Sequence, residues 1–182
     1  MSKTRELYPL SNRKVIKKTL RGVIGHFIFW FSMSAMIVLP MIFGIYQKTN
    51  PEHYYSAGFK VFGIFTVFLI LFFVLLSTFI YLYQKWYFNV YYYDLTEQGV
   101  IIKKGPITPK EVTIPYENIQ DVGVDQDLFD RFFGLYDVHI SSANFVSGLE
   151  AHIDGVLKDG AEGLKNAILA KVKIAKLNNK AL

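Results

Sequence analysis

The sequence predicts a two-helix transmembrane hairpin followed by a mostly β cytoplasmic domain that a C-terminal helix closes. Three observations lead to this fold class. Hydrophobic residues make up 52% and aromatic residues 16% of the 182-residue chain, which is more than a soluble domain usually carries. Most of this excess lies in two long apolar segments, residues 23–45 and 59–83. After residue 86 the period of the apolar residues changes from helical to two, which is typical of strands.

The first transmembrane helix is expected at residues 23–46. Residues 23–45 contain no Asp, Glu, Lys or Arg, and at 1.5 Å per residue they extend about 35 Å. This length exceeds the hydrocarbon core of a bilayer, which is about 30 Å thick. A signal peptide would have a shorter apolar region followed by a cleavage site of small residues, and the sequence has neither feature. We therefore expect this segment to span the membrane.

The second transmembrane helix is expected at residues 59–83, after a polar outer connection at 47–58. The dipeptide Asn50-Pro51 in this connection is a typical turn signal. Lys48 is the connection's single Lys or Arg, whereas seven precede the first helix: Lys3, Arg5, Arg13, Lys14, Lys17, Lys18 and Arg21. The positive-inside rule then predicts a multi-pass protein of the cell membrane with both termini in the cytoplasm.

Residues 1–22 form a basic cytoplasmic segment with two interpretations. It can act only as the signal that sets the topology. It can also lie along the lipid headgroups as a helix, because Ile16, Leu20 and Val23 have helical spacing and the opposite face is basic. In that second interpretation the candidate contacts with anionic lipid are Arg13, Lys14, Lys17, Lys18 and Arg21.

The cytoplasmic domain is expected at residues 86–182, with short strands separated by turn signals. The segments with strand character are YFNVYYYDL, VIIKK, EVTIP, NIQDVGV, YDVHISS and a sixth near residues 149–153. A helix is expected at about 159–177, where Leu164, Ile168, Leu169 and Val172 have helical spacing. Antiparallel strands closed by one helix predict a small barrel or a bent sheet.

One short helical turn interrupts the strands at DLFDRFFG. It places Phe129, Phe132 and Phe133 at positions i, i+3 and i+4, and Gly134 ends it. Three phenylalanines on one turn predict a core plug, in which Phe132, Phe133 or both pack against the sheet.

The domain also resembles the bacterial pleckstrin-homology family, which is also known as the membrane-flanked domain family. The resemblance rests on YYDLTEQGVIIKKG and on VTIPYENIQDVGVDQDLFDRFFGLYDVHISSA, and it covers roughly residues 93–168. The matching positions are Tyr93, Leu95, Thr96, Gly99, Ile114, Pro115, Ile119, Gln120, Val122, Phe133, Gly134 and Leu135. The resemblance implies a PH-like fold and paired transmembrane helices before the domain. It implies little chemistry, because these motif positions are typical of structural roles.

Composition excludes several classes of function. The chain has no cysteine, hence no disulfide, thiolate nucleophile or Cys-based zinc site. The net charge of +5 does not indicate nucleic-acid binding, because residues 1–85 carry +8 and residues 86–182 carry −3. The four histidines (His26, His53, His139 and His152) have no metal-binding spacing along a helix, and His139 alternates with apolar neighbours on a strand. We expect no metal and no cofactor.

The sequence also lacks the motifs of known catalytic sites. It contains no GxSxG, HExxH, P-loop or glycine-rich nucleotide turn, and we therefore expect no enzyme. One acidic cluster, formed by Asp121, Asp125, Asp127 and Asp130, superficially resembles a calcium loop. It lacks the required glycine and glutamate, since Asp130 and Tyr136 occupy those positions. The acidic cluster is better explained as solvated carboxylates that cap the short helix than as a calcium loop.

Three functions remain open. The favoured one is a membrane-anchored protein-interaction or scaffolding module whose partners are the bilayer and another membrane or membrane-associated protein, or a second copy of this chain. The first alternative is recognition of a lipid headgroup by the PH-like domain through Lys103, Lys104 and Lys110. The second alternative is an accessory subunit of a membrane transport complex, with the hairpin as the working part.

Overall fold

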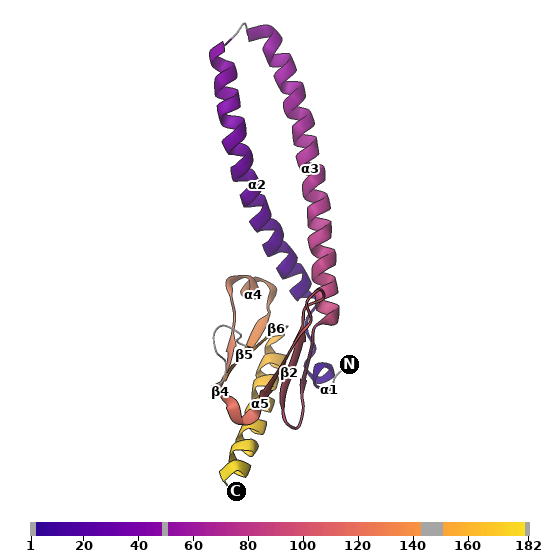
Figure 1. Ribbon diagram of the computed structural model, residues 1–182, viewed down its shortest axis with the longest axis vertical. Helices are drawn as coiled ribbons and strands as arrows, with labels where there is room; N and C mark the ends of the chain where they lie inside the picture. Colours follow the sequence, from indigo (N-terminus) through magenta and orange to yellow (C-terminus); the bar gives the residue numbers. More distant parts are fainter. Residues whose placement is uncertain (1–2, 49–50, 143–150, 181–182) are drawn as a thin grey trace. The chain divides into compact units, whose positions relative to one another are not determined.

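The computed structural model describes residues 3–48, 51–142 and 151–180 (Figure 1). The chain divides into two compact units. Met1–Lys17 together with Gln84–Leu182 is called the β domain, and Lys18–Tyr83 is called the helical segment. The elements are α1 (Lys3–Leu7), α2 (Arg13–Lys48), α3 (Pro51–Val90), β1 (Tyr92–Leu95), β2 (Gly99–Lys104), β3 (Lys110–Pro115), the 3-10 turn η1 (Tyr116–Asn118), β4 (Ile119–Asp125), α4 (Leu128–Phe133), β5 (Tyr136–Ser142), β6 (Ala151–Val156) and α5 (Lys158–Lys180).

The β domain contains two antiparallel three-stranded sheets, in the orders β1-β2-β3 and β4-β5-β6. The expectation of a small closed barrel is wrong, because no ladder joins the two sheets within the described residues. The break lies between β3 and β4. There β3 ends at Pro115, which has no N–H to donate, and η1 redirects the chain into β4.

The inner sides of both sheets and one face of α5 form the core. Val100 pairs with Ile114 in the first sheet, and Val138 pairs with Ile153 in the second. All four side chains are buried, and α5 packs on η1, β4 and β5 with Leu164, Ile168 and Val172 buried. This helix lies where the sequence predicts a closing helix, and its apolar stripe drives its packing on the sheet.

The N-terminus is part of the β domain. Leu10 forms an antiparallel bridge with Val156 at the end of β6, so the N-terminal chain covers part of that strand. Arg5 Nη1 donates to the carbonyl of Tyr91 (2.6 Å), and α1 packs against β1. The boundaries at residues 22 and 86 therefore differ from the observed ones, since residues 1–17 fold together with residues 84–182.

Both long helices extend further than the sequence predicts. α2 continues to Lys48 and α3 begins at Pro51, so most of the predicted connection at 47–58 is helical. Pro51 suits the first position of a helix, where its missing N–H is not needed. At the other end α3 runs to Val90, and residues 86–90 are helical rather than the start of a strand. The aromatic residues around Tyr87 fit both the helical period and the strand period of two. The segment is helical because it continues α3.

The helical segment packs through aromatic side chains. Ring centroids are 5.7 Å apart for Phe27 and Phe73, and 5.5 Å apart for Trp30 and Phe72. Gly22 allows α2 to approach α3, because an added Cβ would lie 3.3 Å from Ile80 Cγ2. Many large apolar side chains of both helices are exposed, among them Phe27, Ile28, Phe29, Phe31, Met36, Ile64, Val67, Phe68, Leu71, Leu75 and Phe79.

One helix in the described part of the chain, Gly63–Val90, is long and apolar enough to cross a membrane, and none of its most apolar window is buried within the protein. The first predicted span, 23–46, extends into residues whose side chains lie outside the described residues. The second span therefore has a matching helix, and the two-span hairpin stays a prediction.

Candidate functional site

The short helix α4 is capped at both ends. At its N-terminus the Asp127 side chain accepts a hydrogen bond from the backbone N–H of Asp130 (2.6 Å). At its C-terminus Gly134 has φ +65°, and the N–H of Leu135 donates to the carbonyl of Asp130 (2.9 Å). These bonds hold six residues as a helix that would be too short to form alone.

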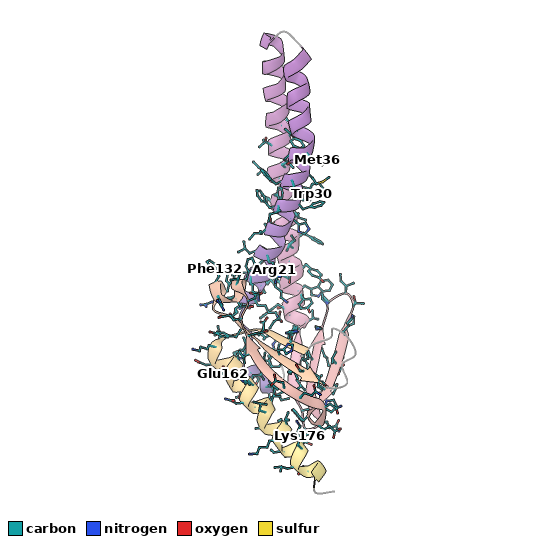
Figure 2. The ribbon with its side chains drawn as sticks, turned by 90° about the vertical axis from the view of Figure 1, so that its left-hand side faces the viewer. Arg21, Trp30, Met36, Phe132, Glu162 and Lys176 are labelled. Atoms are coloured by element: carbon teal, nitrogen blue, oxygen red, sulfur yellow. The ribbon has the colours of Figure 1, made fainter. Side chains whose placement is uncertain are left out.

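The faces of α4 differ from those predicted. Phe132 is 80% exposed and Leu128 is 81% exposed, whereas Asp130 is completely buried. Phe129 and Phe133 are half-buried, so the expectation that α4 is a core plug is wrong. Figure 2 shows Phe132 at the surface of the β domain. Because Leu128 and Phe132 are four residues apart, they form one apolar face, which we call the α4 face.

A buried ion pair explains this orientation. Lys17 Nζ donates to Asp130 Oδ1, and it lies 3.7 Å from Asp127 Oδ2. The side chain of Lys17 is 5% exposed and that of Asp130 is fully buried. Leaving a carboxylate and an ammonium group unpaired in the interior would cost several kcal/mol, so the pair determines which side of α4 faces inward.

A second ion pair lies nearby, and the charge of Asp137 interacts with groups of both pairs. Lys14 Nζ donates to Asp154 Oδ1, with the Lys14 side chain 2% exposed, and it lies 3.9 Å from the ring centroid of Tyr91. Asp137 pairs in register with Asp154, and its Oδ1 accepts from the N–H of Gly155 (3.0 Å). Two lysines and four carboxylates thus form one ionic cluster: Lys14, Lys17, Asp127, Asp130, Asp137 and Asp154.

Burial and neighbouring charges shift the pKa values in this cluster. Burial raises the pKa of Asp130, and the hydrogen bond with Lys17 opposes this rise. For Lys17, burial is outweighed by the hydrogen bond with Asp130 and by the surrounding carboxylates, so its pKa is raised and it stays charged. Burial and the charge of Asp154 raise the pKa of Asp137 to about 6. Asp137 therefore titrates near neutral pH, which makes the cluster pH-sensitive.

The predicted lipid contacts of residues 1–22 are only partly at the surface. Lys14 and Lys17 are buried in the ion pairs above, so they are not placed to contact lipid. Arg13 is exposed, and its Nη1 donates to the carbonyl of Phe133 at the end of α4 (3.2 Å). Lys18 is half-buried and Arg21 is exposed. Contact with anionic lipid stays a prediction for Arg13, Lys18 and Arg21.

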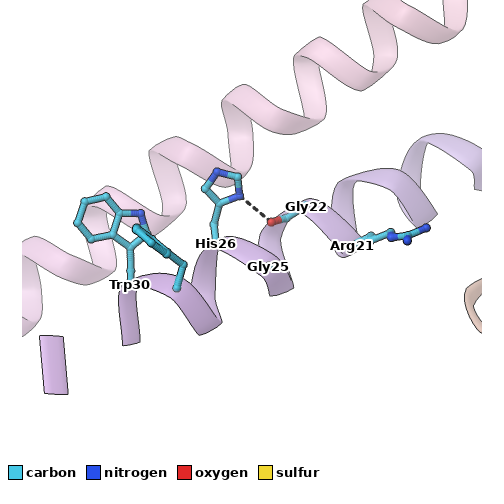
Figure 3. Close-up of a pocket in the computed structure, with 6 residues that line it drawn as sticks. Arg21, Gly22, Gly25, His26 and Trp30 are labelled. Carbon is cyan, nitrogen blue, oxygen red and sulfur yellow. Dashed lines mark hydrogen bonds between the residues drawn. The ribbon is translucent and has the colours of Figure 1, made fainter. Parts of the chain in front are cut away.

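Arg21 also borders an open hollow on α2 (Figure 3). The hollow arises because Gly22 and Gly25 have no side chains, and His26 Nδ1 lies 2.8 Å from the carbonyl of Gly22. All of its lining belongs to this one helix: Arg21, Gly22, Gly25, His26, Phe29 and Trp30. A hollow on one side of a helix does not enclose a ligand, so it is not a binding site.

The alternative headgroup lysines lie on the β2-β3 hairpin. Lys103 Nζ lies 3.0 Å from a carboxylate oxygen of Glu111, which neutralises part of its field. Lys104 and Lys110 are opposite each other in the ladder. The β domain as a whole carries 16 Lys and Arg against 14 Asp and Glu, a net charge of +2 rather than −3, because residues 1–17 and Lys85 belong to it.

The acidic cluster does not form a calcium site. Asp130 and Asp127 face Lys17, and within the described residues there is no group of three or more His, Cys, Asp or Glu side chains that could hold a metal ion. The structure does bring together His139 and His152, for which the sequence shows no metal-binding spacing along a helix. They are opposite each other on β5 and β6, and the signal that would have found them is the strand register.

Comparison with known proteins identifies one family. The family model described as "Bacterial PH domain" matches residues 34–172. No curated protein and no solved structure has a significant match to this chain. The matched range contains the six strands, α4, all of α3 and most of α5.

Proposed function

Because the chain belongs to the bacterial PH domain family, we propose that it is a membrane-anchored module that binds another protein at the cytoplasmic surface through the α4 face. PH-like domains are generally non-catalytic, and the proposed role needs no reaction. The observation that carries the proposal is the exposure of Leu128 and Phe132 on a helix whose buried side is ionic.

The anchoring rests on exposed apolar surface and on chain connectivity. The helix Gly63–Val90 would be buried if it were the core helix of a soluble protein, but none of its apolar window is buried. Residues 1–17 and 84–182 form one unit, so both ends of the intervening segment lie on the same side of any membrane. An apolar segment that crosses there must cross an even number of times. This reasoning supports the hairpin independently of the positive-inside rule.

The surroundings of the α4 face favour a protein partner over a lipid surface. Arg131 on α4 is exposed, and Asp127 at its start is 44% exposed, so both signs of charge border the apolar pair. A purely basic border would be typical of a surface that binds anionic lipid. Apolar and aromatic anchors bordered by Arg and mixed charges are typical of protein interfaces. We therefore infer a partner with an apolar pocket bordered by both charges.

Site-specific photo-crosslinking in the native membrane tests this proposal. A benzophenone amino acid at Phe132 is expected to give a discrete crosslinked protein, and the same probe at Glu162 on the exposed side of α5 is the matched control. Changing Leu128 to Ser should remove the Phe132 product, because it removes half of the apolar face. Crosslinks to lipid alone, to a second copy of the chain, or products unaffected by Leu128→Ser would overturn the proposal in its present form.

The topology is tested separately by cysteine labelling, since the chain has no cysteine of its own. Single cysteines at Ser2, Thr49 and Asn178 are treated in intact cells with a membrane-impermeant reagent. We expect labelling of Thr49→Cys only, with the other two labelled after permeabilisation. Labelling of Asn178→Cys without Thr49→Cys would contradict the proposed orientation.

A further inference from the structure

His139 and His152 lie opposite each other on the outer side of the β4-β5-β6 sheet. They pair in register on the antiparallel strands β5 and β6. Their neighbours Val138, Ile140 and Ile153 are buried in the core, so the two imidazoles point away from it. The strand ladder thus fixes both backbones, and each ring needs only its own two torsions to be positioned.

The distance between the two rings is suited to chelation. His139 Nδ1 lies 3.5 Å from His152 Nδ1, with ring centroids 4.6 Å apart and planes at 64°. A tetrahedral zinc ion with metal–nitrogen bonds of 2.0 to 2.1 Å holds two ligand nitrogens about 3.3 to 3.4 Å apart. The separation of the two Nδ1 atoms therefore matches that of a zinc chelate. Binding one ion between them replaces the hydrogen bond between the rings, and the Nδ1 proton moves to Nε2 of the same ring or to water.

A hydroxyl group on the same strand completes the arrangement. Ser141 Oγ lies 3.1 Å from His139 Nε2. When Nε2–H donates to this hydroxyl, Nδ1 of His139 presents its lone pair toward His152. Metal-binding histidines commonly have such a second hydrogen bond, which fixes the tautomer and the ring orientation.

We propose that His139 and His152 form a chelating site for a divalent transition ion that prefers imidazole ligands, with zinc as the reference ion. Both rings are half-buried, so an ion can reach them from solvent. The acidic pair Asp137 and Asp154 lies two residues along the same strands and adds negative charge, part of which Lys14 neutralises. The remaining coordination positions go to water or to donors from a partner molecule, so the ion is exchangeable rather than structural.

The test uses the full-length chain in detergent, purified without a polyhistidine tag. The background protein carries His26→Gln and His53→Gln. His139 and His152 are then the only two of its four histidines that remain. Zinc titrated by calorimetry is expected to bind with one ion per chain and to raise the temperature of unfolding, because it binds the folded state. Magnesium, which prefers oxygen ligands, should do neither.

Removing either ligand separates a site from general adsorption. His139→Gln and His152→Gln are each expected to weaken zinc binding by about tenfold or more, and Ser141→Ala to weaken it less. Unchanged affinity in both glutamine variants would overturn the proposal, as would the absence of saturable zinc binding in the background protein.

A second measurement does not depend on whether those variants fold. Copper(II) bound to the background protein should show, by electron paramagnetic resonance, coupling to two imidazole nitrogens. Coupling to one or none contradicts the chelate. None of these results bears on the α4 face, whose test is independent.

Discussion

The helices α4 and α5 show the same apolar spacing in the sequence but are held in the β domain by opposite means. α5 packs by its apolar stripe, with Leu164 and Ile168 completely buried. α4 buries Asp130 and leaves Leu128 and Phe132 in solvent. Helical spacing of apolar residues therefore identifies a helix, but the most strongly anchored side chain decides which side faces inward. In α4 that side chain is charged.

The largest expected effect comes from breaking the ionic anchor of α4. Lys17→Met should lower the free energy of unfolding by about 3 to 5 kcal/mol, because it leaves Asp130 buried without its partner. Thermal unfolding of the full-length protein in detergent measures this loss, and Lys173→Met on the exposed side of α5 is the control. The double variant Lys17→Met/Asp130→Leu should recover most of the loss, and failure to do so would mean that the pair is not the anchor.

Truncating the apolar anchor of α5 is expected to lower the free energy of unfolding by a comparable but somewhat smaller amount. Leu164→Ala should cost about 2 to 5 kcal/mol, since it removes a completely buried side chain from the core. Leu169→Ala, on the same helix but 39% exposed, is the matched control and should change little. Equal melting temperatures for the two variants would show that α5 is not packed by its stripe.

The sequence was sufficient to predict those features of the fold that depend on local patterns of apolar residues. It located six strands and the closing helix, because alternating and helical apolar periods reflect which side of each element is buried. It could not reveal the ionic cluster, since Lys14 and Asp154 are separated by 140 positions and no local signal links them. The same limit applies to Phe132, whose exposure follows from the Lys17–Asp130 pair, and to the His139–His152 pair, which depends on strand register.

The ionic cluster should make the free energy of unfolding depend on pH. The expected change is smaller than that of Leu164→Ala and larger than that of Phe132→Ser. The pKa of Asp137 is raised to about 6, so its protonated form favours the folded state. This contribution is complete below pH of about 4 and is lost as the pH rises through 6. Asp137→Asn keeps an oxygen to accept from Gly155 and should stabilise the protein by about 1 to 3 kcal/mol at pH 7.5, with little change at pH 4.

Unfolding of parent and variant across pH 4 to 8 measures this difference directly. Asp125→Asn, at an exposed position on β4, is the control for loss of one surface charge. A variant that is less stable than the parent at pH 7.5 would mean that Asp137 is held as a favourable carboxylate.

The smallest expected effect on stability is at the α4 face. Phe132→Ser removes a side chain that is 80% exposed, and it should change the free energy of unfolding by less than about 0.5 kcal/mol. The same measurement of thermal unfolding applies. A loss as large as that of Leu164→Ala would place Phe132 in a core and would end the contrast between the two helices.

The assignment of residues 1–17 to the β domain also determines the order of events during synthesis. The ribosome completes these residues first, yet Leu10 bridges Val156 and Lys14 pairs with Asp154, near the end of the chain. At 5 to 20 residues per second, the N-terminus waits on the order of 10 s for β6 to emerge. Residues 18–83 leave the ribosome during this interval, so under the proposed topology membrane insertion precedes closure of the domain.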